Sequence, residues 1–151
     1  MAMLKAGDKA PAFKGKDQNG EEVSLKQFLG KKLILFFYPE DDTPVCTQEA
    51  CNFRDNYTDL KKMGYEVVGV SPNGVESHLK FAKKFKLNYT LLADENKTVI
   101  NAYGVWGPKK LYGREYEGIH RMLFVINEKG VIEKIVPKVL SKKAVQQALK
   151  N

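Results

Sequence analysis

The stretch LILFFYPEDDTPVCTQEAC, residues 33–51, decides how this chain folds locally and where its chemistry lies. Its first six residues form an apolar run with lysines before it and a proline after it, a pattern typical of a buried strand. After a short turn, Thr43 and Pro44 predict a helix start, because threonine serves as an N-cap and proline fits the first helical position. Cys46 then stands in the first turn, where unpaired backbone N–H groups and the helix dipole favour a thiolate. The stretch therefore predicts a strand, a turn and a helix that opens on a reactive cysteine.

Strands and helices alternate along the rest of the chain. The expected elements are a hairpin tip at 17–25 with Asn-Gly at its turn, strands at 33–38, 65–71 and 90–93, helices at 44–62 (closed near Gly64), 75–86 and 98–103, a Gly-rich loop at 104–118, strands at 119–126 and 131–136, and a last helix capped by Ser141. The early alternation implies parallel strands, and the terminal hairpin adds antiparallel ones. We therefore expect one α/β domain over residues 1–151, with a mixed central sheet, helices on both faces and an N-terminal hairpin extension. A cysteine at a helix start in such a sheet resembles the thioredoxin-like fold.

Composition and charge exclude several classes of protein. The 151 residues, 43% hydrophobic and 28% charged, are typical of a globular domain with one core. The net charge of +7 is a C-terminal scatter of lysines, since residues 101–151 carry 10 basic and 4 acidic side chains and residues 1–100 carry 15 and 14. Without a basic block or a nucleic-acid motif, we expect no nucleic-acid partner. No apolar run approaches the ~20 residues of a membrane span, and the N-terminus lacks a secretory apolar region, which predicts a cytoplasmic protein without membrane association.

The two cysteines are too few for a disulfide framework, and a close pair in a reducing compartment is catalytic, redox-sensing or metal-binding. On one helix, Cys46 and Cys51 lie ~140° apart around the axis and ~7.5 Å apart along it. A disulfide needs Cα atoms within ~7 Å, so a Cys46–Cys51 bond requires the first turn or two of the helix to unwind. Because only Cys46 gains from the helix dipole, we assign it as the attacking thiolate and Cys51 as the resolving thiol.

An acidic triplet at residues 40–42 disfavours a nearby thiolate, so a compensating cation is expected. The chain has three arginines, Arg54, Arg114 and Arg121. Arg121 is the best candidate because it interrupts a mostly apolar strand, where an unpaired guanidinium is costly; the alternative is an edge-strand arginine that faces water. Glu49, one turn after Cys46, is expected to orient Arg121 through a carboxylate fork, and the alternative is a solvated helix carboxylate.

The pattern Pro39-x-x-x-Thr43-x-x-Cys46 resembles the active-site signature of peroxiredoxins. Residues 38–55 as a whole are similar to the Q-type branch, also called bacterioferritin comigratory protein. Further blocks of that branch are matched in order at 69–71, 77–81, 91–94, 104–107 and 118–121. The likeness covers nearly the whole chain, and together with Cys51 it is specific.

This resemblance implies a thiol peroxidase that reduces hydrogen peroxide and organic hydroperoxides. Cys46 would be the peroxidatic cysteine and Cys51 the resolving cysteine of an intramolecular disulfide cycle. Thr43 would hydrogen-bond the thiolate and the peroxide, Pro39 would shield the sulfur from solvent, and Arg121 would favour the thiolate and polarise the O–O bond. Thioredoxin or a similar dithiol would be the reductant, and no cofactor or metal would be needed. An intramolecular bond needs no partner subunit, which favours a monomer, with a weak dimer as the alternative.

The chain departs from the family pattern at two places. Pro72 and Asn73 stand where an acidic residue usually follows the serine, and Met122 stands where a small hydroxyl residue is common. Both positions concern the shape of the pocket and not the sulfur chemistry.

Two other functions compete with this one. A copper or redox-metal binding module would use both cysteines and a histidine, since soft ligands must converge on one ion. His78 and His120 are isolated in the sequence, so we expect packed or surface histidines in place of ligands. A thioredoxin-type dithiol oxidoreductase typically uses C-x-x-C, whereas four residues separate the two cysteines here.

Overall fold

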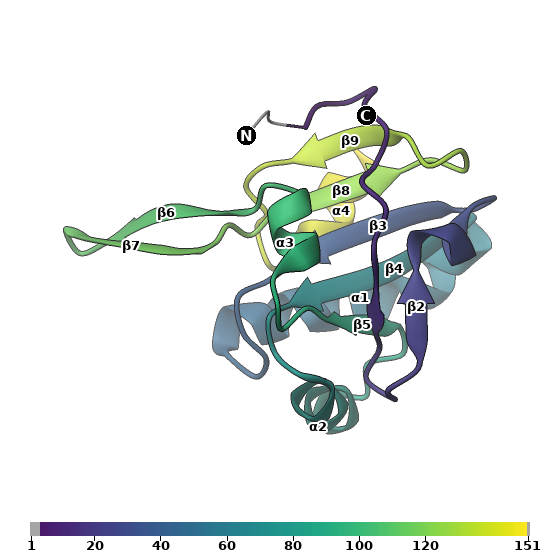
Figure 1. Cartoon of the computed structure of the whole chain (residues 1–151). Helices are drawn as coiled ribbons and strands as arrows, with labels where there is room; N and C mark the ends of the chain where they lie inside the picture. The colour runs from purple at the N-terminus through teal and green to yellow at the C-terminus, as the bar shows by residue number, and fades with distance from the viewer. Residues whose placement is uncertain (1–3, 151) are drawn as a thin grey trace.

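The computed structural model describes residues 4–150, without the side chain of Leu111, and places seven strands of that range in one sheet of order β2-β1-β5-β4-β3-β8-β9 (Figure 1). These strands are β1 (Lys14–Lys16), β2 (Glu22–Ser24), β3 (Lys32–Phe37), β4 (Tyr65–Ser71), β5 (Thr90–Ala93), β8 (Leu123–Ile126) and β9 (Ile132–Val136). The three central strands β3, β4 and β5 run parallel, whereas β8 pairs antiparallel with β3 and β1 pairs antiparallel with β5. The predicted mixed sheet and the N-terminal hairpin are confirmed.

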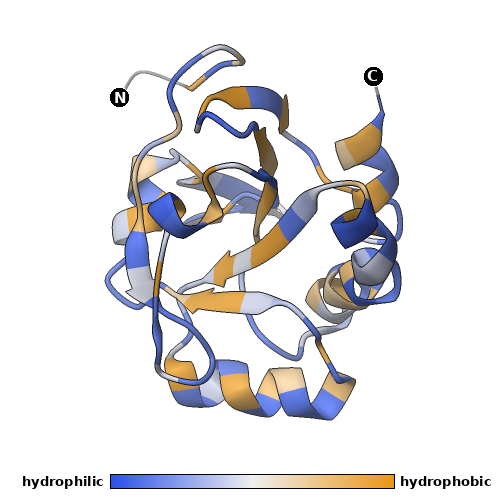
Figure 2. Cartoon of the chain, turned by 90° about the vertical axis from the view of Figure 1, so that its right-hand side faces the viewer, coloured by the Kyte–Doolittle hydropathy of each residue, from blue (hydrophilic) through white to orange (hydrophobic). Residues whose placement is uncertain are grey.

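Helices cover both faces of this sheet, as predicted. The helices are α1 (Pro44–Lys62), α2 (Val75–Phe85), α3 (Thr98–Ala102), α4 (Ala144–Leu149) and a 3-10 helix η1 (Leu25–Phe28). Alternate residues of β3 point to opposite faces: Ile34 and Phe36 join the core under α1, α2 and α4, whereas Leu35 joins the core under α3 and η1. Figure 1 shows α3 in front of the sheet with α1 and α4 behind it, and Figure 2 shows the hydrophobic runs of the strands between these layers. Between residues 4 and 150, none of the helices is long and apolar enough to cross a membrane.

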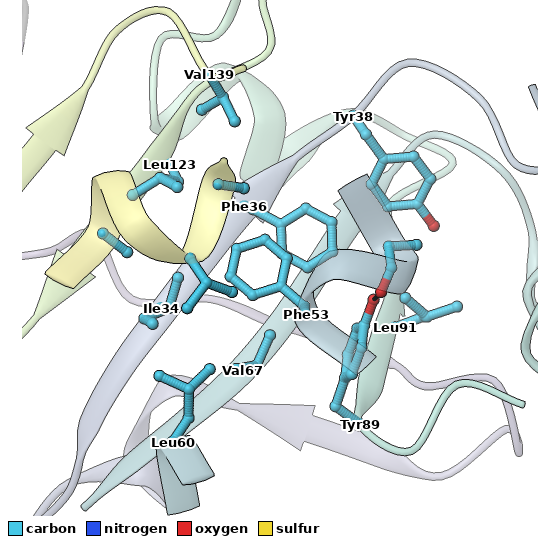
Figure 3. Packing of buried hydrophobic residues seen from close by; sticks show 14 of the residues in the cluster. Ile34, Phe36, Tyr38, Phe53, Leu60, Val67, Tyr89, Leu91, Leu123 and Val139 are labelled. Carbon is cyan, nitrogen blue, oxygen red and sulfur yellow. Dashed lines mark hydrogen bonds between the residues drawn. The ribbon is translucent and has the colours of Figure 1, made fainter. Parts of the chain in front are cut away.

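Aromatic residues fix α1 on the sheet (Figure 3). Phe53 of α1 stacks on Phe36 of β3 with ring centroids 4.5 Å apart, and both side chains are fully buried. The Tyr89 hydroxyl donates a 2.7 Å hydrogen bond to the carbonyl of Ala50 and so ties the middle of α1 to the loop before β5. Each such buried ring contributes about 1.5–3 kcal/mol. The helix that carries Cys46 and Cys51 is therefore anchored along its central turns.

Three of the predicted elements have the bounds that the structure shows, and a fourth is shifted by one residue. The helix at 44–62 and the strands at 65–71 and 90–93 have the predicted bounds, and β3 begins and ends one residue earlier than predicted. Gly64 follows the end of α1 with φ +89°, the left-handed conformation that glycine adopts without strain. The local signals of residues 33–71 were therefore sufficient for this half of the sheet.

The predicted Gly-rich loop at 104–118 is wrong. These residues form a two-stranded hairpin, β6 (Trp106–Leu111) and β7 (Arg114–Ile119), which projects from the body of the molecule in Figure 1. Its turn residues Tyr112 and Gly113 have φ of 53° and 77°, and two positive φ values suit the twist of a two-residue hairpin turn. Most side chains of β7 are exposed, so the strand lacks the apolar alternation that would have revealed it.

Two further predictions need correction. The strand predicted at 119–126 is divided, because Ile119 ends β7 and β8 begins only at Leu123. Ser141 does not cap the last helix, which begins at Ala144 after Lys143. The Ser141 hydroxyl donates instead to the side-chain carbonyl of Gln48 on α1, at 2.9 Å. It therefore links the chain before α4 to α1.

Candidate functional site

Cys46 lies at the third position of α1, which follows β3 after a turn. Pro44 occupies the first turn and Thr43 is the N-cap, as predicted, with extended backbone angles. The Thr43 hydroxyl does not accept a capping hydrogen bond; it donates to the carbonyl of Glu40 at 3.0 Å. Cys46 is only 2% exposed, so its sulfur sits in a desolvated site at the positive end of a helix.

Arg121 brings a positive charge to this sulfur from a distant part of the chain. Its Nη2–H donates to Cys46 Sγ at 3.1 Å, and its Nη1–H donates to Glu49 Oε1 at 2.7 Å. The structure thus brings together the cation, the thiol and the carboxylate that the sequence singled out. Arg121 lies in the connection between β7 and β8, so the prediction that it interrupts a strand is wrong. With 17% of its side chain exposed and both nitrogens bound to buried groups, the alternative of an edge arginine facing water is wrong too.

Glu49 is fully buried, which contradicts the alternative of a solvated carboxylate. Burial raises the pKa of Glu49 to about 7, and the charge and hydrogen bond of Arg121 oppose that rise. The predicted fork is wrong, because only Oε1 is bound and Oε2 has no hydrogen-bond partner among residues 4–150. Glu49 therefore holds Arg121 through one oxygen and leaves the second guanidinium nitrogen for the sulfur.

The buried Glu49 predicts a stability that falls as the pH rises. In the unfolded chain its carboxyl ionises near the ordinary value of 4.5, whereas in the folded protein it keeps its proton up to about pH 7. The folded state binds the extra proton between these values, so the free energy of unfolding should fall across that window, by about 3 kcal/mol in total. Glu49→Gln should remove this fall, as measured by urea unfolding at pH 5 and pH 8.

A matched control for this prediction is Glu76→Gln, because Glu76 is an exposed carboxylate on α2 with 86% of its side chain accessible. The control should keep the wild-type dependence on pH. An equal fall in both variants would mean that Glu49 is not the group responsible.

Cys51 lies further along α1, is half-buried and, like Cys46, is a free thiol in this structure. Burial raises the pKa of Cys51, with Arg54 opposing the rise and Asp55 adding to it. The two thiols sit on one unbroken helix, the geometry in which their bond cannot form. Cys51 is therefore held back as a neutral thiol while Cys46 is the sulfur bound by a cation.

Lys109 is a residue of this site that sequence reasoning missed, since only arginines were considered as cations. It lies on β6, and its ammonium donates to the carbonyl of Ile119 at 2.8 Å. Burial lowers the pKa of Lys109, the charge of Arg121 lowers it further, and Cys46 raises it, so the ammonium interacts electrostatically with both groups. A Cβ on Gly118 would come within 3.2 Å of the Lys109 chain, so glycine at 118 leaves the room for this lysine to cross the hairpin. Lys109 pairs across the hairpin with Tyr116, so its position follows from the tertiary structure and has no local signal in the sequence.

Among residues 4–150, the remaining predicted residues form no hydrogen bond with the Cys46 sulfur. Pro39 is half-buried where the chain leaves β3, and its shielding role stays a prediction. Of the acidic triplet, Glu40 and Asp42 are exposed, whereas Asp41 is buried and directed toward α2. His78 is a packed histidine with no exposed surface, as expected. Within the described range, no group of three or more histidine, cysteine or acidic side chains is placed to hold a metal ion.

Comparisons with known proteins agree on one family. Residues 6–135 match the AhpC/TSA family. Over 135 residues the chain is 47% identical to Peroxiredoxin Bcp of Escherichia coli K12, a match that covers 89% of this chain and 86% of that protein. The crystal structure of Peroxidoxin BcpB from Mycobacterium tuberculosis is similar with a TM-score of 0.85 and 32% identity, covering 97% and 94% of the two chains. The bacterioferritin comigratory protein of Xanthomonas campestris, described for its alkyl peroxide reduction activity, gives a TM-score of 0.88 and 28% identity over 96% and 95%.

Proposed function

The chain belongs to the AhpC/TSA family, among the peroxiredoxins of the Bcp type, and from this premise we propose that it is a thiol peroxidase acting on hydrogen peroxide and organic hydroperoxides. One observation carries the proposal: the Arg121 guanidinium binds the buried Cys46 sulfur at 3.1 Å and is itself held by Glu49 at 2.7 Å. The alkyl peroxide reduction described for the Xanthomonas relative supports organic hydroperoxides as substrates.

In the first step the Cys46 thiolate attacks one oxygen of the hydroperoxide. An S–O bond forms as the O–O bond breaks, and the electron pair leaves on the other oxygen, as hydroxide or alkoxide, which takes a proton from solvent. Arg121 donates into the region where this negative charge develops, and such preorganised donors lower the barrier. The Thr43 hydroxyl gives its hydrogen to the Glu40 carbonyl, which leaves none for the Cys46 thiolate in this conformation. We therefore propose only the peroxide half of the predicted role, in which the Thr43 oxygen accepts from the peroxide O–H. Cys46 ends as a sulfenic acid.

In the second step the Cys51 sulfur attacks the sulfenic sulfur of Cys46. A disulfide forms and the hydroxyl group leaves as water, the thiol of Cys51 supplying the proton. An external dithiol of the thioredoxin kind then reduces the disulfide by exchange and restores both thiols. Because the two cysteines share an intact α1 in the reduced protein, this step requires the start of the helix to unwind. Pro39 is proposed to shield the sulfur before the attack.

The same cycle suggests the setting in which the protein works. Both sulfurs come from one chain, so the disulfide requires no second subunit, and we propose a monomer with a weak dimer as the alternative. The cycle begins from two reduced thiols, which supports a reducing compartment such as the cytoplasm. A copper or redox-metal module and a thioredoxin-type oxidoreductase gain no support from this site.

The experiment that tests the cycle uses Cys51→Ser. One equivalent of hydrogen peroxide should convert the reduced wild type to an intramolecular disulfide, two mass units lighter than the dithiol, since two hydrogens are lost. Cys51→Ser should consume one equivalent, give a sulfenic acid that dimedone traps, and then stop turning over with a thioredoxin-type reductant. Mass spectrometry of the quenched protein measures both outcomes. Sustained turnover of Cys51→Ser at the wild-type rate would contradict the role given to Cys51.

A further inference from the structure

A buried polar cluster fastens the chain before Cys46 to helix α2. The Asp41 carboxylate accepts hydrogen bonds from the Tyr38 hydroxyl at 2.6 Å and from the Ser77 hydroxyl at 2.7 Å, and its Oδ2 lies 2.7 Å from His78 Nδ1. The Asp41 side chain is 4% exposed and that of His78 is fully buried. The backbone N–H of Asp41 adds a 2.8 Å bond to the side-chain carbonyl of Asn73. We name this set of five residues the Asp41 cluster.

Each side-chain polar atom of Asp41 and His78 has a hydrogen-bond partner within the protein. His78 Nε2 lies 3.1 Å from the carbonyl of Leu92, which can only accept, so Nε2 carries a hydrogen and donates it. His78 Nδ1 and Asp41 Oδ2 lie 2.7 Å apart, so one hydrogen bond joins them. Removing Tyr38 leaves Asp41 Oδ1 without a partner, and removing the Asp41 carboxylate leaves His78 Nδ1 without one. Such a loss is more costly than losing an exposed hydrogen bond.

The cluster ends directly before the helix segment that must unwind. Asp42, the next residue, pairs with Lys84 of α2 at 2.7 Å and holds the left-handed φ of 59°. The Thr43 hydroxyl binds Glu40, and the Thr43 carbonyl accepts the first helical bond, from the N–H of Thr47 at 2.8 Å. The turn at 40–43 is thus continuous with the first turn of α1, and Cys46 is five residues from the fastened Asp41.

The other end of the segment is also held by hydrogen bonds. Cys51 stands between two anchored residues, since the Ala50 carbonyl accepts from Tyr89 and the Asn52 side chain accepts from the N–H of Val145 at 2.9 Å. Cys46 is therefore the partner that moves when the disulfide forms. To move, it must draw the turn at 40–43 away from α2.

We infer that the Asp41 cluster is a latch that holds Cys46 in its peroxide-reactive position and sets the rate at which it can reach Cys51. Asp41, Ser77 and His78 act as positioning residues, because they do not touch the reacting sulfur. The inference rests on the proposed disulfide cycle. In this view, the Asp41 cluster controls the rate of disulfide formation although it lies outside the thiol site. Weakening the cluster should therefore speed disulfide formation and leave the reaction with peroxide nearly unchanged.

The test follows one turnover after one equivalent of hydrogen peroxide, with rapid quenching, alkylation and mass spectrometry to separate sulfenic acid from disulfide. Ser77→Ala removes one hydrogen bond and should speed disulfide formation about three- to tenfold. Asp41→Ala removes the three side-chain bonds to Tyr38, Ser77 and His78 and should exceed tenfold. Asp41→Asn, which can accept from Tyr38 and donate to His78, should return toward the wild type. The rate of peroxide consumption should stay within about twofold in Ser77→Ala.

Lys80→Ala is the control, because Lys80 is exposed on the same helix and lies outside the cluster. It should leave both rates unchanged. In the reduced protein, amide exchange at residues 43–49 should accelerate in Ser77→Ala and stay unchanged at 52–62. An unchanged or slower disulfide step in Ser77→Ala overturns the latch while the cycle stands, and so does unchanged exchange at 43–49. If the wild type itself forms no disulfide, it is the proposed cycle that fails.

Discussion

Cys46→Ser should abolish hydroperoxide reduction, with a loss of at least about 10⁴-fold in kcat/KM, as is typical when a nucleophile is removed. The attacking group is a thiolate, and a serine hydroxyl stays protonated at neutral pH, so it cannot displace the leaving oxygen of a peroxide. The Arg121 guanidinium, 3.1 Å from the sulfur, would stay in place but would have no anion to activate. Peroxide remaining after reaction with the reduced protein and a dithiol measures the loss.

Two observations separate this result from misfolding. Serine keeps an acceptor for the Arg121 N–H and is nearly the same size, so the free energy of unfolding of Cys46→Ser should stay within about 1 kcal/mol of the wild type. Cys51→Ser, in contrast, should keep the first turnover. If Cys46→Ser still consumed peroxide while Cys51→Ser did not, the two roles would have to be exchanged.

The central sheet and α1 could be predicted from the sequence because their signals are local. The apolar run that forms β3 is buried on both faces, and Thr43, Pro44 and Gly64 mark the two ends of the helix with residues suited to those positions. Burial on both faces produces an unbroken apolar run, which needs no knowledge of tertiary structure to recognise. These elements also fix where Cys46 lies.

The hairpin β6–β7 could not be predicted in the same way, because it stands away from the core. A proline at 108 and glycines at 107 and 118 read as a loop, and the exposed side chains of β7 show no apolar alternation. The strand is nonetheless formed, because the hairpin turn at Tyr112 and Gly113 brings the two segments into register. The same error concealed Lys109, whose position depends on the pairing of these two strands.

The sequence predicts which residues form the site, but it does not predict how their side chains are arranged. Cys46, Arg121 and Glu49 were named because a thiolate needs a cation and a buried cation needs a carboxylate, which is general electrostatics. The use of a single Glu49 oxygen and the direction of Asp41 toward α2 depend on how deeply each carboxylate is buried. Burial of a polar side chain is a tertiary property, so the sequence does not distinguish the buried Asp41 from its exposed neighbours Glu40 and Asp42.

Arg121→Met should lower kcat/KM for hydrogen peroxide by about 10²- to 10³-fold, the loss typical of removing one preorganised donor from a developing negative charge. Methionine fills a similar volume but offers no N–H to the sulfur. The thiolate fraction of Cys46 at neutral pH should fall as well, as measured by the thiolate absorbance near 240 nm in the Cys51→Ser background. Both losses have one cause, since the guanidinium of the wild type faces the sulfur and the leaving oxygen together.

The variant should still fold, because Glu49 can take up a proton when its partner Arg121 is removed. Arg121 opposes the effect of burial on Glu49, so its removal should raise the pKa of Glu49 above about 7 and leave a neutral carboxyl in the core at neutral pH. Arg114→Met is the matched control, since Arg114 is an exposed arginine on the projecting hairpin, and it should keep both the activity and the thiolate fraction. An Arg121→Met protein with an unaltered thiolate fraction would assign the activation of Cys46 to the helix dipole and to Lys109. A loss of rate without a loss of thiolate would show that Arg121 acts on the leaving oxygen alone.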